Sequence, residues 1–253
     1  MKKPIRKGGY RPAKHAGQHD RRSARFSRQV AVLYEDDAVV VLNKPAGLLA
    51  VPVEGSDRPS ALSIVGADLK SRRERALIVH RIDRFTSGVL LFAKTDSDRQ
   101  ALVKQFLAHT PVREYLTVVR GRLTVKAGTL VHYFRREGMF QIPTTANDPE
   151  GARAELRYSV ERPLRGATLV RASLVTGLQN QIRVQFQELG HTVIGDRKYS
   201  KEEASERRIA RVALHAAKLQ FIHPRSGEMI SVECELPADF QSLIKSLQLP
   251  ARR

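Results

Sequence analysis

The 253-residue sequence predicts an α+β fold in which helices flank a mixed, largely antiparallel sheet. Short aliphatic runs of strand length are interspersed with a few apolar patterns of helical period. They do not follow the regular strand–helix–strand alternation that a parallel sheet requires. No repeat of solenoid period is visible. The length suffices for one sizeable hydrophobic core or two small ones.

Six aliphatic runs are expected to form strands, at residues 30–34, 38–42, 77–80, 89–93, 115–120 and 169–175. Apolar positions recur at helical spacing in two further segments, residues 99–107 and 179–189, and a third helix is expected over residues 202–210.

The segment 179–189 is informative because it carries a cation next to its apolar face. Ile182, Phe186 and Leu189 recur at i, i+4 and i+7, which places them on one side of a helix. Arg183 lies one position round from Ile182, at the margin of that apolar stripe. We therefore expect Arg183 to be partly desolvated and still able to reach into a cleft.

The positive charge is spread over the whole chain. The formal net charge is +18, and residues 1–28 contribute ten Lys/Arg against one acid. This segment is poor in aliphatic residues and is expected to be a disordered arm, whereas residues 29–248 are expected to fold as one domain. A basic body with a basic arm suits a polyanion such as nucleic acid, although a solubilising charge surplus would look similar.

Composition excludes several classes of protein. Cys234 is the only cysteine, so neither an intramolecular disulfide nor a multi-cysteine zinc site is possible, and a reducing compartment fits. No apolar run approaches the roughly 20 residues that span a bilayer. The charged N-terminal sequence has no apolar stretch behind it, so it is not a secretory signal. We expect a soluble, cytoplasmic protein that uses no metal.

The segment 80–88, His-Arg-Ile-Asp-Arg-Phe-Thr-Ser-Gly, lies between two apolar runs and predicts a loop between strands. Asp83 is its only acid, and Arg81 and Arg84 flank it. Nearby positive charge favours the ionised carboxylate, which can act as a nucleophile or charge stabiliser but is a poor proton donor. On chemistry alone, an aspartate that merely ties the loop is an equally good interpretation.

The amino-acid sequence of this segment resembles the HRLD-x-x-TSG signature of RluA-type pseudouridine synthases, with Ile82 in place of the usual leucine. Four further blocks of that family resemble stretches of this chain in the same order. They are residues 43–47 (Asn-Lys-Pro-Ala-Gly), residues 113–115, residues 181–184 with 189–191 and 195–196, and residues 214–216 with 223–224. The resemblance extends from about residue 31 to residue 240.

The resemblance implies the pseudouridine synthase fold, with a central catalytic cleft, and an enzyme that isomerises uridine to pseudouridine in ribosomal or transfer RNA. It implies no cofactor and no metal, and we expect a monomer whose partner is RNA. Many family members carry an N-terminal S4-type RNA-binding domain. The basic arm here is too short to be one, so RNA binding would depend on the arm or on the catalytic domain.

Three residues match the catalytic positions of the family. Asp83 corresponds to the catalytic carboxylate, Tyr115 to the tyrosine that lies against the flipped base, and Arg183 to the arginine that pairs with the carboxylate. Without the resemblance, Tyr115 would read as an ordinary strand tyrosine and Arg183 as a surface arginine. Five residues are expected to contact substrate: His80, Arg81, Arg84, Thr86 and Asn180.

The other blocks that carry the resemblance are expected to have structural roles. His80 is expected to orient the loop as a hydrogen-bond donor, because its spacing from Asp83 fixes no metal geometry. The Lys44-Pro45 block and residues 214–216 are expected to close turns and pack the sheet, and Gly195-Asp196 is expected to form a turn.

The chain departs from the family pattern in one block. Where the family usually has G-R-T-H-Q-I-R-V-H, the arginine and both histidines are replaced by Leu178, Asn180 and Gln185. We interpret these changes as an altered RNA contact. The alternative is an RNA-binding homologue without activity, against which Asp83, Tyr115 and Arg183 argue. A metal-dependent nuclease would need a carboxylate cluster that the sequence does not offer.

Overall fold

The computed structural model describes residues 26, 29–200 and 208–249. The arm expected over residues 1–28 and the helix expected over residues 202–210 therefore lie largely outside the described residues. Within the described part of the chain, no helix has the length and apolar character needed to cross a bilayer.

The chain forms two compact units. Unit 1 comprises the residues up to Val112 together with Ala216–Glu235, and unit 2 comprises Arg113–His215 together with the residues from Leu236 onward. The organisation of residues 29–248 as one catalytic domain stays a prediction.

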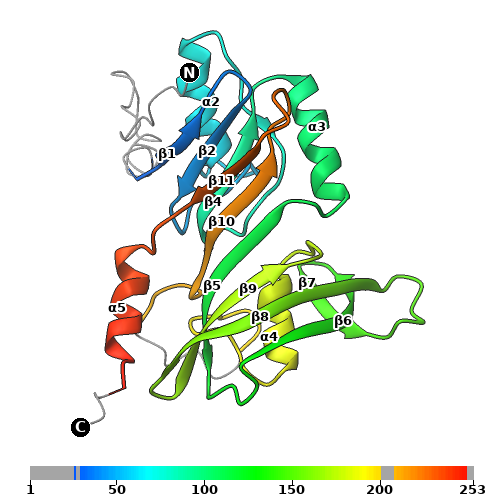
Figure 1. Ribbon diagram of the computed structural model, residues 1–253, viewed down its shortest axis with the longest axis vertical. Helices are drawn as coiled ribbons and strands as arrows, with labels where there is room; N and C mark the ends of the chain where they lie inside the picture. The colour runs from blue at the N-terminus through cyan, green and yellow to red at the C-terminus, as the bar shows by residue number, and fades with distance from the viewer. Residues whose placement is uncertain (1–25, 27–28, 201–207, 250–253) are drawn as a thin grey trace. The chain divides into compact units, whose positions relative to one another are not determined.

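Unit 1 contains a sheet with one helix on each face. Its strands are β1 (Ala31–Glu35), β2 (Val39–Lys44), β3 (Leu77–Ile78), β4 (Ser87–Ala93), most of β10 (Leu214–Ile222) and β11 (Met229–Glu233). Its helices are α2 (Ala61–Ser71) and α3 (Asp96–Leu107), drawn in Figure 1. The strand order is β1-β2-β4-β10-β11, and β3 pairs with β4.

The two helices explain why β2 and β4 read as continuous apolar runs. Successive side chains of a strand point to opposite faces of the sheet. Val39 and Val41 of β2 pack in the same cluster as Leu102 of α3. Val40 of β2 packs in a second cluster with Val65 of α2. Both faces of these strands are therefore buried, which removes the need for alternating polar residues.

Each of the two helices of unit 1 begins after a residue whose side-chain hydroxyl caps it. The Ser60 hydroxyl accepts a hydrogen bond from the Ser63 backbone N–H at 3.0 Å, and the Ser63 hydroxyl accepts one from the Ser60 N–H in return. Thr95 caps α3 by accepting from the Asp98 N–H at 3.2 Å. Such caps satisfy backbone donors that a helix N-terminus leaves without partners.

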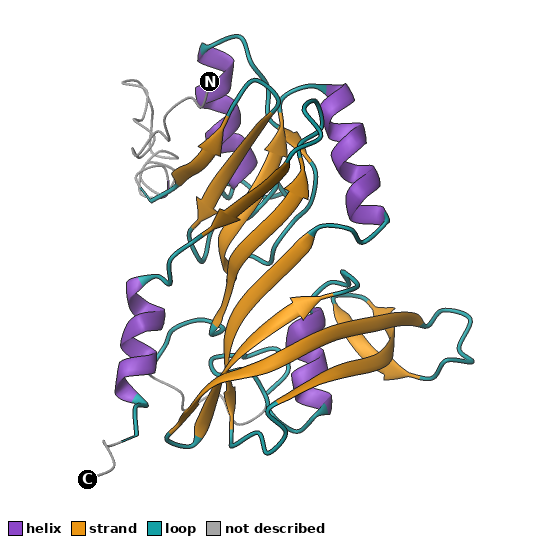
Figure 2. Cartoon of the chain, in the orientation of Figure 1, coloured by secondary structure: helices purple, strands orange, loops and turns teal. Residues whose placement is uncertain are grey.

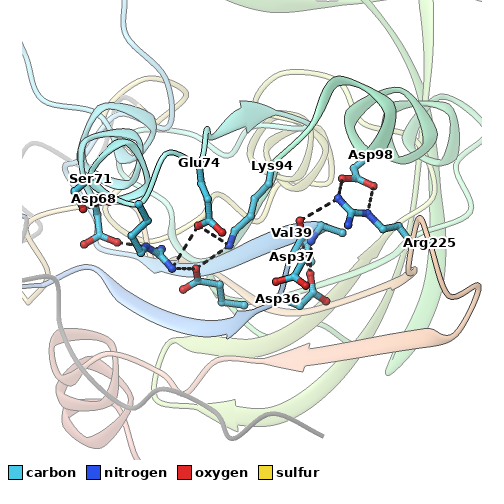
Figure 3. Close-up of polar contacts among 12 residues, drawn as sticks. Asp36, Asp37, Val39, Asp68, Ser71, Glu74, Lys94, Asp98 and Arg225 are labelled. Atoms are coloured by element: carbon cyan, nitrogen blue, oxygen red, sulfur yellow. Dashed lines mark hydrogen bonds and ion pairs between the residues drawn. The ribbon is translucent and has the colours of Figure 1, made fainter. Parts of the chain in front are cut away.

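Two sets of ion pairs connect elements of unit 1, one of them at Lys94, which directly follows β4 (Figure 3). The Lys94 ammonium contacts Glu35 at 2.9 Å and Glu74 at 3.0 Å. Arg225 donates to both carboxylate oxygens of Asp98, at 2.9 and 2.7 Å. The Arg225 guanidinium holds the pKa of Asp98 below its usual range, because it stabilises the ionised carboxylate. The Lys94 contacts connect the end of β4 to the end of β1 and to the segment after α2, and the Arg225 contact connects the turn between β10 and β11 to the beginning of α3.

Gly88, the last residue of the signature segment, has a backbone conformation reserved for glycine. Its φ is +113°, and a Cβ there would lie 2.1 Å from the carbonyl oxygen of Ala216 in the same unit. There is thus no room for a side chain at position 88, and the φ angle there is strained for any residue other than glycine.

We expect Gly88→Ala to lower the free energy of unfolding by at least about 2 kcal/mol, because strain and a backbone clash add. Urea unfolding checks this. Gly227→Ala is the matched control, since Gly227 also has positive φ (+71°) but open space around it. Equal destabilisation by the two substitutions would show that the close approach to Ala216 is unimportant.

Unit 2 contains antiparallel strands of the same 11-stranded sheet, with a helix packed on one side of them (Figure 2). Its strands, in spatial order, are β5 (Val112–Arg120), β9 (Ala167–Leu174), β8 (Ala152–Leu164), β6 (Ala127–Glu137) and β7 (Phe140–Thr144). Its helices are α4 (Gln181–Glu188) and α5 (Ala238–Ser246). Val184 of α4 packs against Phe134 and Ala154 of the sheet. The predicted α+β class, with a largely antiparallel sheet, is confirmed.

Candidate active site

The loop that carries Asp83 leads directly into β4. The Asp83 carbonyl accepts a hydrogen bond from the Thr86 N–H at 3.1 Å, which closes a turn over Arg84 and Phe85. Ile82 is buried and anchors the loop, whereas Asp83 is half-buried. The carboxylate is thus presented from a short turn with an apolar anchor on one side and a buried strand on the other.

A second loop braces this turn through its backbone. The Gly47 N–H donates to the Arg84 carbonyl at 2.8 Å, and the Arg84 Nε donates back to the Gly47 carbonyl at 2.9 Å. Lys44 is fully buried, and its ammonium donates to the carbonyls of Leu48 at 2.8 Å and Arg84 at 3.1 Å. This agrees with the structural role expected for the Lys44-Pro45 block. The residue after Asp83 is held by three hydrogen bonds.

His80 is held by a hydrogen bond to strand β4 and by a ring contact with α3. Its Nε2 accepts a hydrogen bond from the Leu91 N–H at 3.1 Å, so the histidine is an acceptor in this contact. The neutral ring then carries its proton on Nδ1. The ring also stacks on Phe106 of α3, with centroids 4.6 Å apart. This contact makes the ring an acceptor at Nε2, and its expected role as a donor stays a prediction.

The other expected substrate contacts of this loop differ in accessibility. Arg81 is exposed, as a phosphate contact requires. Arg84 is half-buried, and its guanidinium lies 4.9 Å from the centroid of the Phe85 ring. Thr86 is 1% exposed, and its hydroxyl has no hydrogen-bond partner among the described residues. Contact of RNA with Thr86 would therefore require the loop to move. Their roles in binding substrate stay predictions.

In unit 2, Arg183 is fixed by a carboxylate that the sequence did not single out. Its Nε and Nη2 donate to the two oxygens of Asp196, each at 2.7 Å, and its Nη1 donates to the Asn180 Oδ1 at 2.7 Å. The Arg183 side chain is 11% exposed and that of Asp196 is 1% exposed. This bidentate geometry fixes both position and orientation of the guanidinium.

Asp196 does form part of a turn, as expected, but it has a second role. One carboxylate oxygen also accepts from the backbone N–H groups of Lys198 and Tyr199, at 2.9 and 3.1 Å. Gly195 precedes it with φ +77°, and a Cβ there would lie 2.0 Å from the Arg211 carbonyl. The sequence signal that could have identified Asp196 was the Gly-Asp pair within a block of the family pattern. Such a pair indicates a tightly packed turn that orients a carboxylate.

Asn180 supports Arg183 from the start of α4. Its φ of +58° lies in the left-handed region, which asparagine tolerates better than most residues. Besides accepting from Arg183, its amide donates to the Tyr199 hydroxyl at 3.4 Å. The Tyr199 ring centroid lies 5.3 Å from the Arg183 guanidinium, and burial raises the pKa of Tyr199. Asn180 is 8% exposed, so its expected contact with substrate stays a prediction.

Tyr115 lies on β5, opposite Ala172 of β9, and is 9% exposed. Two positions earlier, Arg113 holds the end of β9 by donating to the carbonyls of Val175 and Thr176, at 3.0 and 3.2 Å. Gly177 leaves room for this guanidinium, because a Cβ there would lie 2.7 Å from the Arg113 Nη1. Burial lowers the pKa of Arg113. The strand that carries Tyr115 thus also fixes the chain entering α4.

Among the described residues, no group of three or more His, Cys, Asp or Glu side chains could hold a metal ion.

The sequence model of the RNA pseudouridylate synthase family matches residues 38–188. The chain belongs to that family.

Relatives within the family cover most of the chain. The ribosomal large subunit pseudouridine synthase D of Zymomonas mobilis is 33% identical over 233 residues, which is 87% of this chain and 74% of that protein. The ribosomal large subunit pseudouridine synthase C of Salmonella typhimurium is 37% identical over 218 residues, covering 81% of this chain and 66% of that protein. The predicted resemblance is thus confirmed at the level of the family.

A solved structure of human RNA pseudouridylate synthase domain containing 4 has a similar fold. It superposes with a TM-score of 0.74 and 20% identity, covering 92% of this chain and 98% of that one. At this identity the likeness concerns the fold alone, and it agrees with the largely antiparallel sheet described above.

The structure corrects our interpretation of one departure from the family pattern, Gln185, whereas an altered RNA contact at Leu178 and Asn180 stays a prediction. Gln185 is fully buried, and its amide donates to the carbonyls of Leu130 and Ala154, each at 3.1 Å. Its oxygen accepts from Gln181 at 3.0 Å. Leu178 packs against the apolar cluster around Phe134. Gln185 therefore joins a buried polar network and is not an altered RNA contact, and Leu178 extends the core beneath α4.

Proposed function

We propose that the protein isomerises uridine to pseudouridine in RNA, with Asp83 as the catalytic carboxylate. The observation that carries this proposal is the placement of Asp83, the only acid of the family signature, on a turn whose next residue is held by Lys44 and Gly47. Such bracing keeps one carboxylate in one position, which a reaction at a single carbon centre requires.

The chemistry needs one ionised carboxylate. The N1–C1′ bond of uridine breaks, the uracil turns, C5 bonds to C1′, and the C5 proton is lost while N1 gains one. Positive charge develops at C1′ as in a glycosidase, but the leaving base must be kept and water excluded, so a second acid is not needed. The target base must first leave its stack, which costs a few kcal/mol and is easiest in loops and single strands.

The other two roles follow from the family resemblance. Tyr115 would lie against the flipped base, where an aromatic face contributes about 1–3 kcal/mol whatever the base. Arg183 would hold the catalytic carboxylate ionised. The bidentate contact with Asp196 fixes the position of the guanidinium that this role would use. The pairing of Arg183 with Asp83 stays a prediction.

We infer that the RNA is ribosomal, because the relatives above are named for the large ribosomal subunit. Transfer RNA is the alternative substrate expected from the sequence. A cytoplasmic location and a monomeric state are part of the same proposal. The high positive charge, +18, supports a polyanionic substrate in either case.

Tritium release tests the proposal. RNA labelled at uridine C5 is incubated with purified protein, and pseudouridines are mapped in total RNA from cells with and without the protein. We expect release from one RNA class and the loss of at least one mapped pseudouridine without the protein. Binding of RNA without release from any cellular RNA would instead favour the inactive RNA-binding homologue.

The basic arm gives a further expected result. Residues 1–25 carry nine Lys/Arg and one acid, so they should add affinity that does not depend on sequence. Deleting residues 2–25, which leaves Phe26 packed on the core of unit 1, should weaken binding at low salt. It should also flatten a log–log salt slope of about −0.7 per neutralised phosphate on single strands. An unchanged slope would assign the arm to another partner.

A further inference from the structure

Four side chains of unit 2 alternate between cation and aromatic ring. The Arg183 guanidinium lies 5.3 Å from the centroid of the Tyr199 ring. The Lys198 ammonium lies 5.1 Å from the same ring and 4.7 Å from the Phe140 ring. Phe140 and Tyr199 meet edge to face, with centroids 6.1 Å apart. We call Arg183, Tyr199, Lys198 and Phe140 the cation–aromatic ladder.

The ladder leads from a buried side chain to solvent. Arg183 is 11% exposed, whereas Phe140 at the start of β7 is 46% exposed and its neighbour Met139 is 72% exposed. The hairpin turn between β6 and β7 is held to the ladder, because Lys198 donates to the Met139 carbonyl. Arg136, also exposed, donates to the Gly138 carbonyl at 3.0 Å. An accessible ring therefore lies among cations.

This composition fits single-stranded nucleic acid. Sites that bind single strands without reading sequence combine aromatic faces for stacking with cations for the backbone. An ordinary clamp between a hairpin and a turn would gain more by burying Phe140 than by leaving nearly half of it exposed. Arg183, one of the proposed catalytic residues, is itself a member of the ladder and is linked to Phe140 through the Tyr199 ring.

We propose that the cation–aromatic ladder is a stacking platform for a nucleotide of the RNA substrate other than the target uridine, with Phe140 as the ring and Lys198 as the phosphate contact. This rests on the proposed function and adds to it a site for RNA outside the target uridine. The platform would supply affinity that tolerates any base, because every base has a π-face.

A fluorescent single strand tests the platform. A ten-nucleotide oligouridylate with 2-aminopurine at successive positions is titrated with the full-length protein, and stacking on a ring quenches its emission. We expect quenching at one or two positions. Phe140→Ala and Phe140→Leu should each weaken binding about tenfold, whereas Phe140→Tyr should stay within about twofold of wild type. Lys198→Met should reduce the salt slope by about 0.7.

Controls separate stacking from folding. Met229→Ala removes an apolar side chain that is 61% exposed in unit 1 and should change nothing. Thermal unfolding of each variant checks that the hairpin is intact. Wild-type affinity for Phe140→Leu would overturn the proposal, since an apolar clamp needs no ring, and so would an absence of quenching. Tritium release by the wild type is measured separately, so the platform can fail while the isomerase activity stands, and the reverse.

Discussion

Asp83→Asn is expected to abolish pseudouridine formation while RNA binding survives. The amide has nearly the shape of the carboxylate, so the turn closed by the Asp83 carbonyl and the Thr86 N–H should persist. What disappears is the negative charge that would stabilise or attack C1′. No second acid lies in the segment 80–88 to replace it.

Tritium release and filter binding, measured on the same preparation, check this result. Asp57→Asn is the matched control, because it makes the same chemical change at an exposed position of the same unit. It should leave both quantities unchanged. Activity of Asp83→Asn within about tenfold of wild type, or roughly 1.4 kcal/mol of barrier, would show that the mechanistic assignment is wrong.

The sequence predicted those elements whose patterns are simple. The strand expected over residues 89–93 is β4, and the helix expected over 99–107 is α3, because a buried strand is continuously apolar and an amphipathic helix repeats every three to four residues. β8 was missed, although Arg153, Glu155 and Arg157 alternate with the buried Ala154, Leu156 and Tyr158. This period-two pattern is that of a strand with one buried face, so the sequence did contain the signal.

Helix α2 was missed for a local reason. It contains a glycine and the β-branched pair Ile64 and Val65, which are weak helix formers, and its cap uses Ser60 with Ser63 in place of the usual acid or glutamine. Packing of Ile64 and Val65 against the sheet stabilises it instead. Propensity was overridden by tertiary contacts, which a single sequence does not show.

In the candidate site too, the sequence predicted some features and missed others. A motif singled out Asp83. Asp196, however, lies thirteen residues after Arg183 and beyond the end of α4, a separation that no periodicity of the sequence connects. The burial of Gln185, by contrast, could have been predicted. It lies three residues after Ile182 and one before Phe186, on the apolar face already recognised for this helix. Replacing a histidine there changes a buried network, and the RNA-binding surface is not involved.

Asp196→Asn is expected to lower kcat about 10²-fold, with a smaller change in KM, if Arg183 acts in the reaction. Asp196 is 1% exposed and Arg183 is 11% exposed, so the amide leaves a desolvated guanidinium without its counter-charge. Breaking one side of a buried pair costs about 3–5 kcal/mol, much of it relieved by movement of the remaining ion. A displacement of about 1 Å at a catalytic group is enough to cost roughly 10² in rate.

Asp239→Asn is the control that separates positioning from general loosening. Asp239 forks onto Arg211 in the same unit, at 2.6 and 2.9 Å, and the Arg211 side chain is 6% exposed. That variant should also lose stability, yet keep its kcat per folded molecule, because Arg211 has no proposed part in the reaction. Steady-state tritium release and urea unfolding of both variants decide the matter. Equal losses of kcat would mean that Asp196 only supports the fold, whereas a loss confined to Asp196→Asn means that the carboxylate acts through Arg183.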